Sequence, residues 1–188
     1  MGTRAASAEA TGQRILDAAV EVFWELPGES ISLDEVARRS GVAVQTVIRR
    51  FGGRDGLFAA AAEREFERVR AHRDEAPVGD VAGVVRLLLD HYEEIGDRLL
   101  RLLSEAERLP RLGAIAERGR SYHRGWCARV FAAALEGREG VERRRRLTQL
   151  VTVSDVYVWK LLRRDGCLSR RQTERALVEL LQPLLEAR

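Results

Sequence analysis

Apolar side chains recur along most of the chain at intervals of three and four residues, the spacing of one face of an α-helix. No convincing run of alternating or β-branched residues appears, so no segment predicts a strand. The four prolines fall at plausible helix boundaries. The pattern therefore predicts an all-α fold of about nine helices.

The first predicted helix covers Gly12–Glu25 and ends at the sequence Leu26-Pro27-Gly28. Its apolar face consists of Ile15, Ala19, Val22, Phe23 and Leu26. A capping box opens the next helix: the Ser32 hydroxyl should accept from the third backbone amide, and the Glu35 side chain should reach back to the cap. This second helix should end near Ser40.

A third helix is expected over Val44–Phe51, where Gly52-Gly53 ends it, and a long fourth helix from Arg54 to about Glu75. The remaining helices are expected over Asp80–Leu103, Ser104–Leu109, Pro110–Glu136, Val141–Arg164 and Ser169–Glu186. We place the joint between domains at Ala76–Asp80. The predicted organisation is a helix-turn-helix domain over residues 1–53, a connecting segment over 54–79 and a C-terminal effector-binding and dimerisation domain over 80–188.

The last two predicted helices have the strongest apolar faces and suit a subunit interface. The candidate dimerisation residues are Leu150, Val158, Leu161, Leu177, Leu180, Leu181 and Leu184. The same faces also suit the core of a single chain, because periodicity does not show which partner an apolar face meets.

Two short helices joined at Gly41 form a pattern typical of a helix-turn-helix. Ala37 supplies the small residue needed where the helices cross, four positions before the glycine. The wedge between them is expected to hold Val36, Val42 and Val47. Helices joined by a glycine turn also occur in proteins that do not bind DNA, so this spacing alone leaves the function open.

With Val47 inward, Gln45, Thr46 and Arg49 face outward at the position where a recognition helix meets base edges. Gln45 suits adenine, and Arg49 suits guanine or a phosphate. The Ser32 hydroxyl and the backbone amides at Val44 are candidates for phosphate contacts.

The charge pattern supports this assignment more than the net charge of +3 does. The segment Val36–Arg54 contains no acidic residue. Its five arginines are Arg38, Arg39, Arg49, Arg50 and Arg54. Such a local positive stripe favours a nucleic-acid partner.

Four motifs in order resemble the tetracycline-repressor (TetR) family over Ile15–Ala62. They are Ile15-Leu16-Asp17-Ala18-Ala19 with Phe23, Ser32-Leu33-Asp34-Glu35-Val36-Ala37, Gly41 to Phe51, and Arg54-Asp55-Gly56-Leu57-Phe58. The resemblance implies a homodimer that binds a palindromic operator in double-stranded DNA, a small-molecule effector in the C-terminal domain, and a four-helix dimer bundle built from the last two helices.

The sequence departs from the family pattern at three positions. Ala43 replaces a serine that would cap the recognition helix, at a typical cost of about 1 kcal/mol. Ile48 replaces a tyrosine that commonly contacts a phosphate, whereas Arg54 keeps the charge of the usual lysine. We therefore expect the phosphate contacts to rest on Arg50 and Arg54.

The candidate effector-binding residues combine aromatic and polar groups on helices that can converge. They are His91, Tyr92, His123, Trp126, Asp155 and Trp159. Aromatic residues at helical spacing are more often core, and a histidine beside them is usually a packing residue. His123 and Cys127 lie one turn apart, but two ligands do not make a metal site, so neither a metal nor a cofactor is predicted.

Other classes fit less well. No run of about 18 apolar residues predicts a membrane span, no signal-peptide core appears at the start, and a cytoplasmic location is expected. The catalytic motifs HExxH and GxSxG and a glycine-rich phosphate loop are absent, which argues against an enzyme. The sequence thus predicts a DNA-binding repressor released by a small molecule. The alternative is a DNA-binding regulator or architectural protein whose C-terminal domain only dimerises or binds protein.

Overall fold

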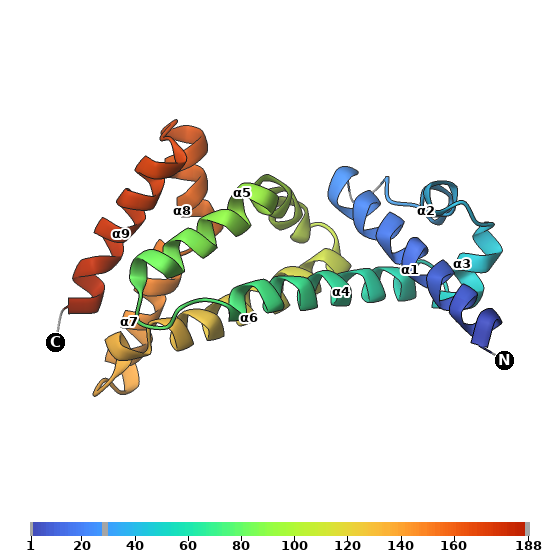
Figure 1. Cartoon of the computed structure of the whole chain (residues 1–188). Coiled ribbons are helices and arrows are strands. Elements are labelled where there is room, and N and C mark those ends of the chain that lie inside the picture. Colours follow the sequence, from blue (N-terminus) through green and yellow to red (C-terminus); the bar gives the residue numbers. More distant parts are fainter. Residues whose placement is uncertain (1, 28–29, 187–188) are drawn as a thin grey trace. The chain divides into compact units, whose positions relative to one another are not determined.

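The computed structural model describes residues 2–27 and 30–186, and this part of the chain is helical with no strand (Figure 1). The predicted all-α fold is confirmed. Gly28, expected to help end the first helix, lies outside the described residues. The chain divides into two compact units, Met1–Arg70 and Ala71–Arg188.

The first unit contains α1 (Gly2–Glu25), α2 (Leu33–Ser40), α3 (Val44–Phe51) and most of α4 (Arg54–Asp74). The predicted start of the first helix at Gly12 is wrong, because α1 begins at Gly2. The added segment contains four alanines among its first nine residues, and alanine has the highest helix propensity. The predicted bounds of the second and third helices are confirmed.

One apolar cluster joins the helices of the first unit. Ile15 and Val22 of α1, Val36 of α2, Val47 of α3 and Leu57 of α4 are each 0% exposed. Burial of a large aliphatic side chain contributes about 1.5–3 kcal/mol. This shared core fixes which face of α3 remains on the surface.

The second unit contains the end of α4 and the remaining helices. In chain order these are α5 (Val81–Ala106), α6 (Pro110–Val130), the 3₁₀ turn η1 (Ala132–Leu135), α7 (Gly140–Val153), α8 (Val156–Lys160), the π-helical turn η2 (Leu161–Asp165) and α9 (Arg170–Glu186). Among the described helices, none is long and apolar enough to cross a bilayer.

Three predicted boundaries in this unit are wrong. No separate helix begins at Ser104, because α5 continues to Ala106. Within this helix the Ser104 hydroxyl donates to the Arg101 carbonyl 2.8 Å away. The predicted helix from Pro110 ends at Val130 and is followed by a 3₁₀ turn.

The predicted continuous helix Val141–Arg164 breaks after Val153. Asp155 adopts an extended backbone there, and its carboxylate accepts the Tyr157 amide at 3.0 Å as the N-cap of α8. An aspartate that satisfies a backbone amide locally competes with continuation of the helix.

The core of the second unit surrounds α5 and contains four large aromatic side chains, Tyr92, Trp126, Phe131 and Trp159. Trp159 is 0% exposed and lies against Gly96 of α5. A Cβ atom added at Gly96 would meet the indole ring well inside van der Waals distance. Gly96 therefore allows α8 to pack closely on α5.

Candidate nucleic-acid interface

The start of α2 is fixed by half of the predicted capping box. The Ser32 hydroxyl accepts the Glu35 amide at 3.2 Å, as expected. The Glu35 side chain was expected to accept a hydrogen bond from the cap residue. It accepts hydrogen bonds from Arg38 and Arg39 instead, at 2.6 and 2.7 Å. These hydrogen bonds, with Arg38 the larger influence, lower the pKa of Glu35 to about 2.

The turn between α2 and α3 depends on Gly41. This residue adopts the left-handed conformation with φ of 68°, and its amide donates to the Ala37 carbonyl. A side chain would find open space here, so the backbone conformation alone favours glycine. Val36 and Ala37 are buried as predicted, while Val42 is half-buried against the same core.

Burial of Val47 orients α3 and places Gln45 and Arg49 on the opposite, exposed face. These two residues are one helical turn apart and therefore lie side by side on the surface. In the described part of the chain neither side chain has a hydrogen-bond or ion-pair partner. Thr46 and Val44 are half-buried at the edge of this face, and Val44 also packs against the core.

The five arginines of the positive stripe are not equally available to a partner. Arg38 and Arg39 are paired with Glu35, and Arg39 also contacts Glu25 of α1 at 2.5 Å. The charge on α2 is thus largely neutralised within the unit. The stripe that remains available consists of arginines on α3 and at the start of α4.

Arg50 lies against α1. Its guanidinium occupies the space that a Cβ atom would take at Gly12, and its Nη2 is 3.3 Å from Glu9 Oε2. Arg54, at the start of α4, is half-buried and places its guanidinium 5.9 Å from the centre of the Phe58 ring. Both arginines keep part of their surface exposed.

The departures from the family pattern have visible consequences. Ala43 has the extended backbone of an N-cap, with φ of −72° and ψ of 145°, but α3 has no side-chain cap. Ile48 is 36% exposed beside Arg49, so an apolar surface stands where a phenol would offer a hydrogen bond.

The candidate dimerisation residues separate into two groups. Leu150, Leu177 and Leu181 are at most 2% exposed within the chain, so they belong to its own core. Leu161 and Leu180 are 59% and 48% exposed and provide apolar surface on η2 and α9. Val158 and Leu184 are half-buried, so their exposure lies between those of the two groups.

The candidate effector residues meet around a residue that the sequence did not single out, Arg73 at the end of α4. Its guanidinium lies 5.7 Å from the Tyr92 ring centre and 5.1 Å from that of Trp126. Its Nη1 is 2.9 Å from His123 Nδ1. In the sequence Arg73 stands in a charged segment that resembles a solvated helix end, and no pattern distinguishes it.

The hydrogen bond to Arg73 determines the tautomer of His123. A guanidinium only donates, so Nδ1 must accept and the proton lies on Nε2, which is 3.7 Å from Cys127 Sγ. Burial, and then the charge of Arg73, lower the pKa of His123 to about 3. Burial also raises the pKa of Cys127 to about 12. His123 is therefore neutral and the thiol protonated near pH 7.

The other candidate residues have structural partners. The Tyr92 hydroxyl donates to the Ser154 carbonyl at 2.9 Å, and its burial raises its pKa. The Trp159 indole donates to Glu93 at 3.2 Å. His91 is 5% exposed, with its ring 5.5 Å from that of Tyr92. Among the described residues, no group of three or more His, Cys, Asp or Glu side chains could hold a metal ion.

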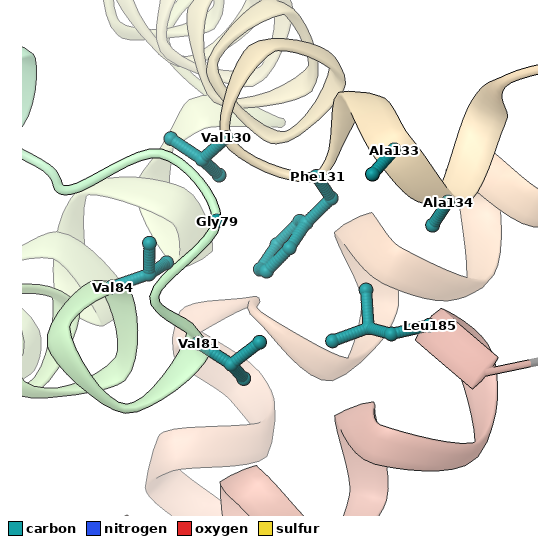
Figure 2. A pocket seen from close by; sticks show the side chains of 8 residues that line it. All are labelled: Gly79, Val81, Val84, Val130, Phe131, Ala133, Ala134 and Leu185. Carbon is teal, nitrogen blue, oxygen red and sulfur yellow. The ribbon is translucent and has the colours of Figure 1, made fainter.

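Two hollows lie in the second unit. An apolar pocket of about 120 Å³ is bounded by the ends of α5, α6 and α9, with Phe131 between its walls (Figure 2). A cleft of about 330 Å³ lies beside the turn between α5 and α6, and its polar walls are Glu107, Arg120, Asp155 and Tyr157. Of the candidate effector residues, only Asp155 lines either hollow.

Comparison with known proteins finds a family match for the helix-turn-helix segment. The model of the bacterial regulatory proteins of the tetR family matches residues 15–61, the segment that contains α2, the Gly41 turn and α3. The N-terminal segment of the chain is therefore similar to this family. The resemblance inferred from the four sequence motifs is thereby confirmed.

Individual relatives agree over the N-terminal part. The HTH-type transcriptional repressor KstR of Mycolicibacterium smegmatis is 39% identical over 64 residues, which is 34% of this chain and 31% of that protein. The HTH-type transcriptional regulator SrpR of Pseudomonas putida is 44% identical over 62 residues, 32% of this chain and 29% of that protein. The matched stretch thus spans about a third of each relative.

The similarity of fold extends over nearly the whole chain. The crystal structure of a transcriptional regulator from Rhodococcus sp. RHA1 matches with a TM-score of 0.69 and 21% identity, over 93% of this chain and 95% of that one. At this identity the match establishes the fold alone, including that of the C-terminal helices.

Proposed function

We propose that this protein is a sequence-specific DNA-binding transcriptional regulator that acts as a repressor. The observation that carries the proposal is the exposed face of α3, where Gln45 and Arg49 stand side by side with no partner in the described part of the chain. Both side chains suit the major groove, since Gln pairs with adenine and Arg with guanine.

Phosphate contacts surround this face. The Ser32 hydroxyl accepts the Glu35 amide and keeps its own hydrogen for a phosphate oxygen. Arg50 and Arg54 supply charge at the end of α3 and the start of α4. Thr46, Val44 and the backbone amides at the start of α3 complete the proposed surface.

A homodimer suits such a reader, because two copies of α3 read two half-sites of a palindromic operator. We propose that Leu161 and Leu180, with Val158 and Leu184 beside them, form the interface, since they keep apolar surface outside the core. The buried Leu150, Leu177 and Leu181 would support this face from beneath.

We further propose that a small molecule in the second unit releases the repressor from DNA. The ligand must bind the released form more tightly than the DNA-bound form, because only differential binding shifts the equilibrium. Among the predicted residues, Tyr92, His123 and Trp126 gather around Arg73, with His91, Trp159 and Asp155 in the surrounding layer.

The second candidate is a regulator whose C-terminal unit only dimerises or binds protein. The dense packing of that unit favours it, because Trp126 and Trp159 are at most 1% exposed and both indoles have hydrogen-bond partners. The two candidates share the DNA-binding surface and differ only in the response to a ligand.

Operator selection from random DNA, followed by gel-shift titrations, tests the DNA-binding role. Gln45→Ala and Arg49→Ala should change which sequences are selected, by about 1–3 kcal/mol at the contacted base pairs. Arg50→Ala and Arg54→Ala should weaken binding to all sequences and reduce the salt dependence. Arg175→Ala, on an exposed arginine of α9, is the matched control. Unchanged selection by both Gln45→Ala and Arg49→Ala would refute the assignment of α3.

A further inference from the structure

Arg73 is a buried cation without an acidic partner. Its side chain is 4% exposed, and its Nε atom has no hydrogen-bond partner in the described part of the chain. Its guanidinium lies against the Tyr92 and Trp126 rings and beside the acceptor nitrogen of His123, which is neutral. No described carboxylate forms an ion pair with it.

The charge of Arg73 influences Asp155, but the two residues form no ion pair in the described part of the chain. Burial raises the pKa of Asp155, and the charge of Arg73 offsets only part of this rise. One Asp155 oxygen already accepts the Tyr157 amide. An uncompensated buried charge is costly, and buried arginines are usually completed by a carboxylate or another anion.

An apolar pocket lies in the same unit, one to two helical turns along α5 and α6 from the residues that contact this cation. Trp126, which touches Arg73, and Val130, which lines the pocket, are one turn apart on α6, a rise of about 6 Å. On α5, Tyr92 and Val84 lie on the same stripe two turns apart. Figure 2 shows Val84, Val130 and Leu185 around Phe131.

Phe131 links the pocket to Trp126, which contacts the cation. Its ring points among the pocket side chains, and it meets the Trp126 ring edge-to-face with centres 6.4 Å apart. The eight pocket-lining residues carry no charge: Gly79, Val81, Val84, Val130, Phe131, Ala133, Ala134 and Leu185.

We infer that the second unit binds a small monocarboxylate with an apolar body. The carboxylate binds the Arg73 guanidinium through Nε and an Nη atom, and the apolar body occupies the pocket beside Phe131. The planar guanidinium matches a carboxylate with two parallel hydrogen bonds. This inference deepens the proposed function by naming the chemical class of its effector.

The pocket limits the size of the ligand. A dry cavity of about 150 Å³ holds benzene, and the volume here is about 120 Å³. By this comparison of volumes, aliphatic acids with about four to six carbons are suitable probes.

The test uses the full chain with butanoate, hexanoate and their neutral isosteres butanamide and hexanamide. Binding is followed by tryptophan fluorescence, because the Trp126 indole donates to the Arg73 carbonyl at 2.9 Å and reports on this site. We expect each acid to bind at least about tenfold more tightly than its amide, since the amide lacks the charge. Equal binding of acid and amide would overturn the inference.

Variants assign the binding to this site. Arg73→Met should abolish the preference for the acid, whereas Arg175→Met, on an exposed arginine, should keep it. Ala133→Leu, at an exposed position on the pocket wall, should weaken the binding of hexanoate more than that of butanoate. This variant still tests the site if Arg73→Met does not fold. An acid preference that survives Arg73→Met, or hexanoate binding that Ala133→Leu leaves unchanged relative to butanoate, would contradict the proposal.

Gel shifts on the selected operator separate this inference from the proposed function. Operator binding without an acid preference would refute the monocarboxylate and leave the DNA reader intact. An acid preference without sequence-specific DNA binding would support the ligand site and refute the regulator.

Discussion

Arg50 Nη2 lies 3.3 Å from Glu9 Oε2, so an ion pair links the last turn of α3 to the first half of α1. Glu9 belongs to the segment that the sequence pattern left outside the first helix. Its carboxylate pairs with Arg50, the arginine that we propose to contact a DNA phosphate. Glu9 therefore competes with DNA for the same cation.

Glu9→Gln should raise affinity for DNA of any sequence by roughly 1.4- to fivefold, because an exposed ion pair is worth about 0.2–1 kcal/mol. Gel shifts at two salt concentrations measure the change. Glu21→Gln, an exposed glutamate elsewhere on α1, is the control and should have little effect. Equal gains in both variants would mean that only net charge matters.

Ala43→Ser should stabilise the first unit by about 1 kcal/mol, because the serine hydroxyl can accept an amide in the first turn of α3. Urea unfolding measures this as a higher midpoint. The control Ala59→Ser lies at an exposed position inside α4 and should lose a few tenths of a kcal/mol. A gain at both positions would exclude capping as the cause.

Leu161→Glu combined with Leu180→Glu should convert a dimer into monomers, since two charges would be buried in the proposed interface. Sedimentation measures the oligomeric state. Val141→Glu changes a residue of α7 that is 76% exposed and should not alter it. A dimer that survives the double substitution would place the interface elsewhere.

His123 should make stability depend on pH. The folded pKa is about 3 against an ordinary 6.5, so below about pH 6.5 only the unfolded chain takes up this proton. Stability is then full above pH 7 and falls as the pH drops from about 6.5 toward 3, by at most about 1.4 kcal/mol per unit. Urea unfolding between pH 5 and 7 measures the slope.

His123→Gln is the matched variant, because its amide oxygen can still accept from Arg73 but does not titrate in this range. The difference in stability between the two proteins should shrink or change sign as the pH falls. A slope that is the same in both proteins would assign the pH dependence to other groups.

The sequence predicted the DNA-reading unit well because its signals are local. Ser32 caps, Gly41 turns and Val47 packs within a few residues of their partners, so spacing alone specifies them. The pattern of apolar residues did not predict the start of α1. The alanines of this segment favour a helix but do not form the apolar face that indicates one in a sequence.

The second unit was harder to predict because its decisive contacts join distant segments. Arg73 meets Tyr92, His123 and Trp126, which are remote in the sequence, and nothing local distinguishes it from a solvated arginine. Periodicity likewise could not separate the core residue Leu181 from the exposed Leu180, its neighbour on α9.

The opposite environments of the two cysteines have a practical consequence. Cys127 is buried and its pKa is raised to about 12, whereas Cys167 is exposed after η2. Only a thiolate reacts readily with alkylating reagents. A maleimide dye should therefore attach to the folded chain at one position, so the natural sequence already offers a specific labelling site next to the proposed interface residue Leu161.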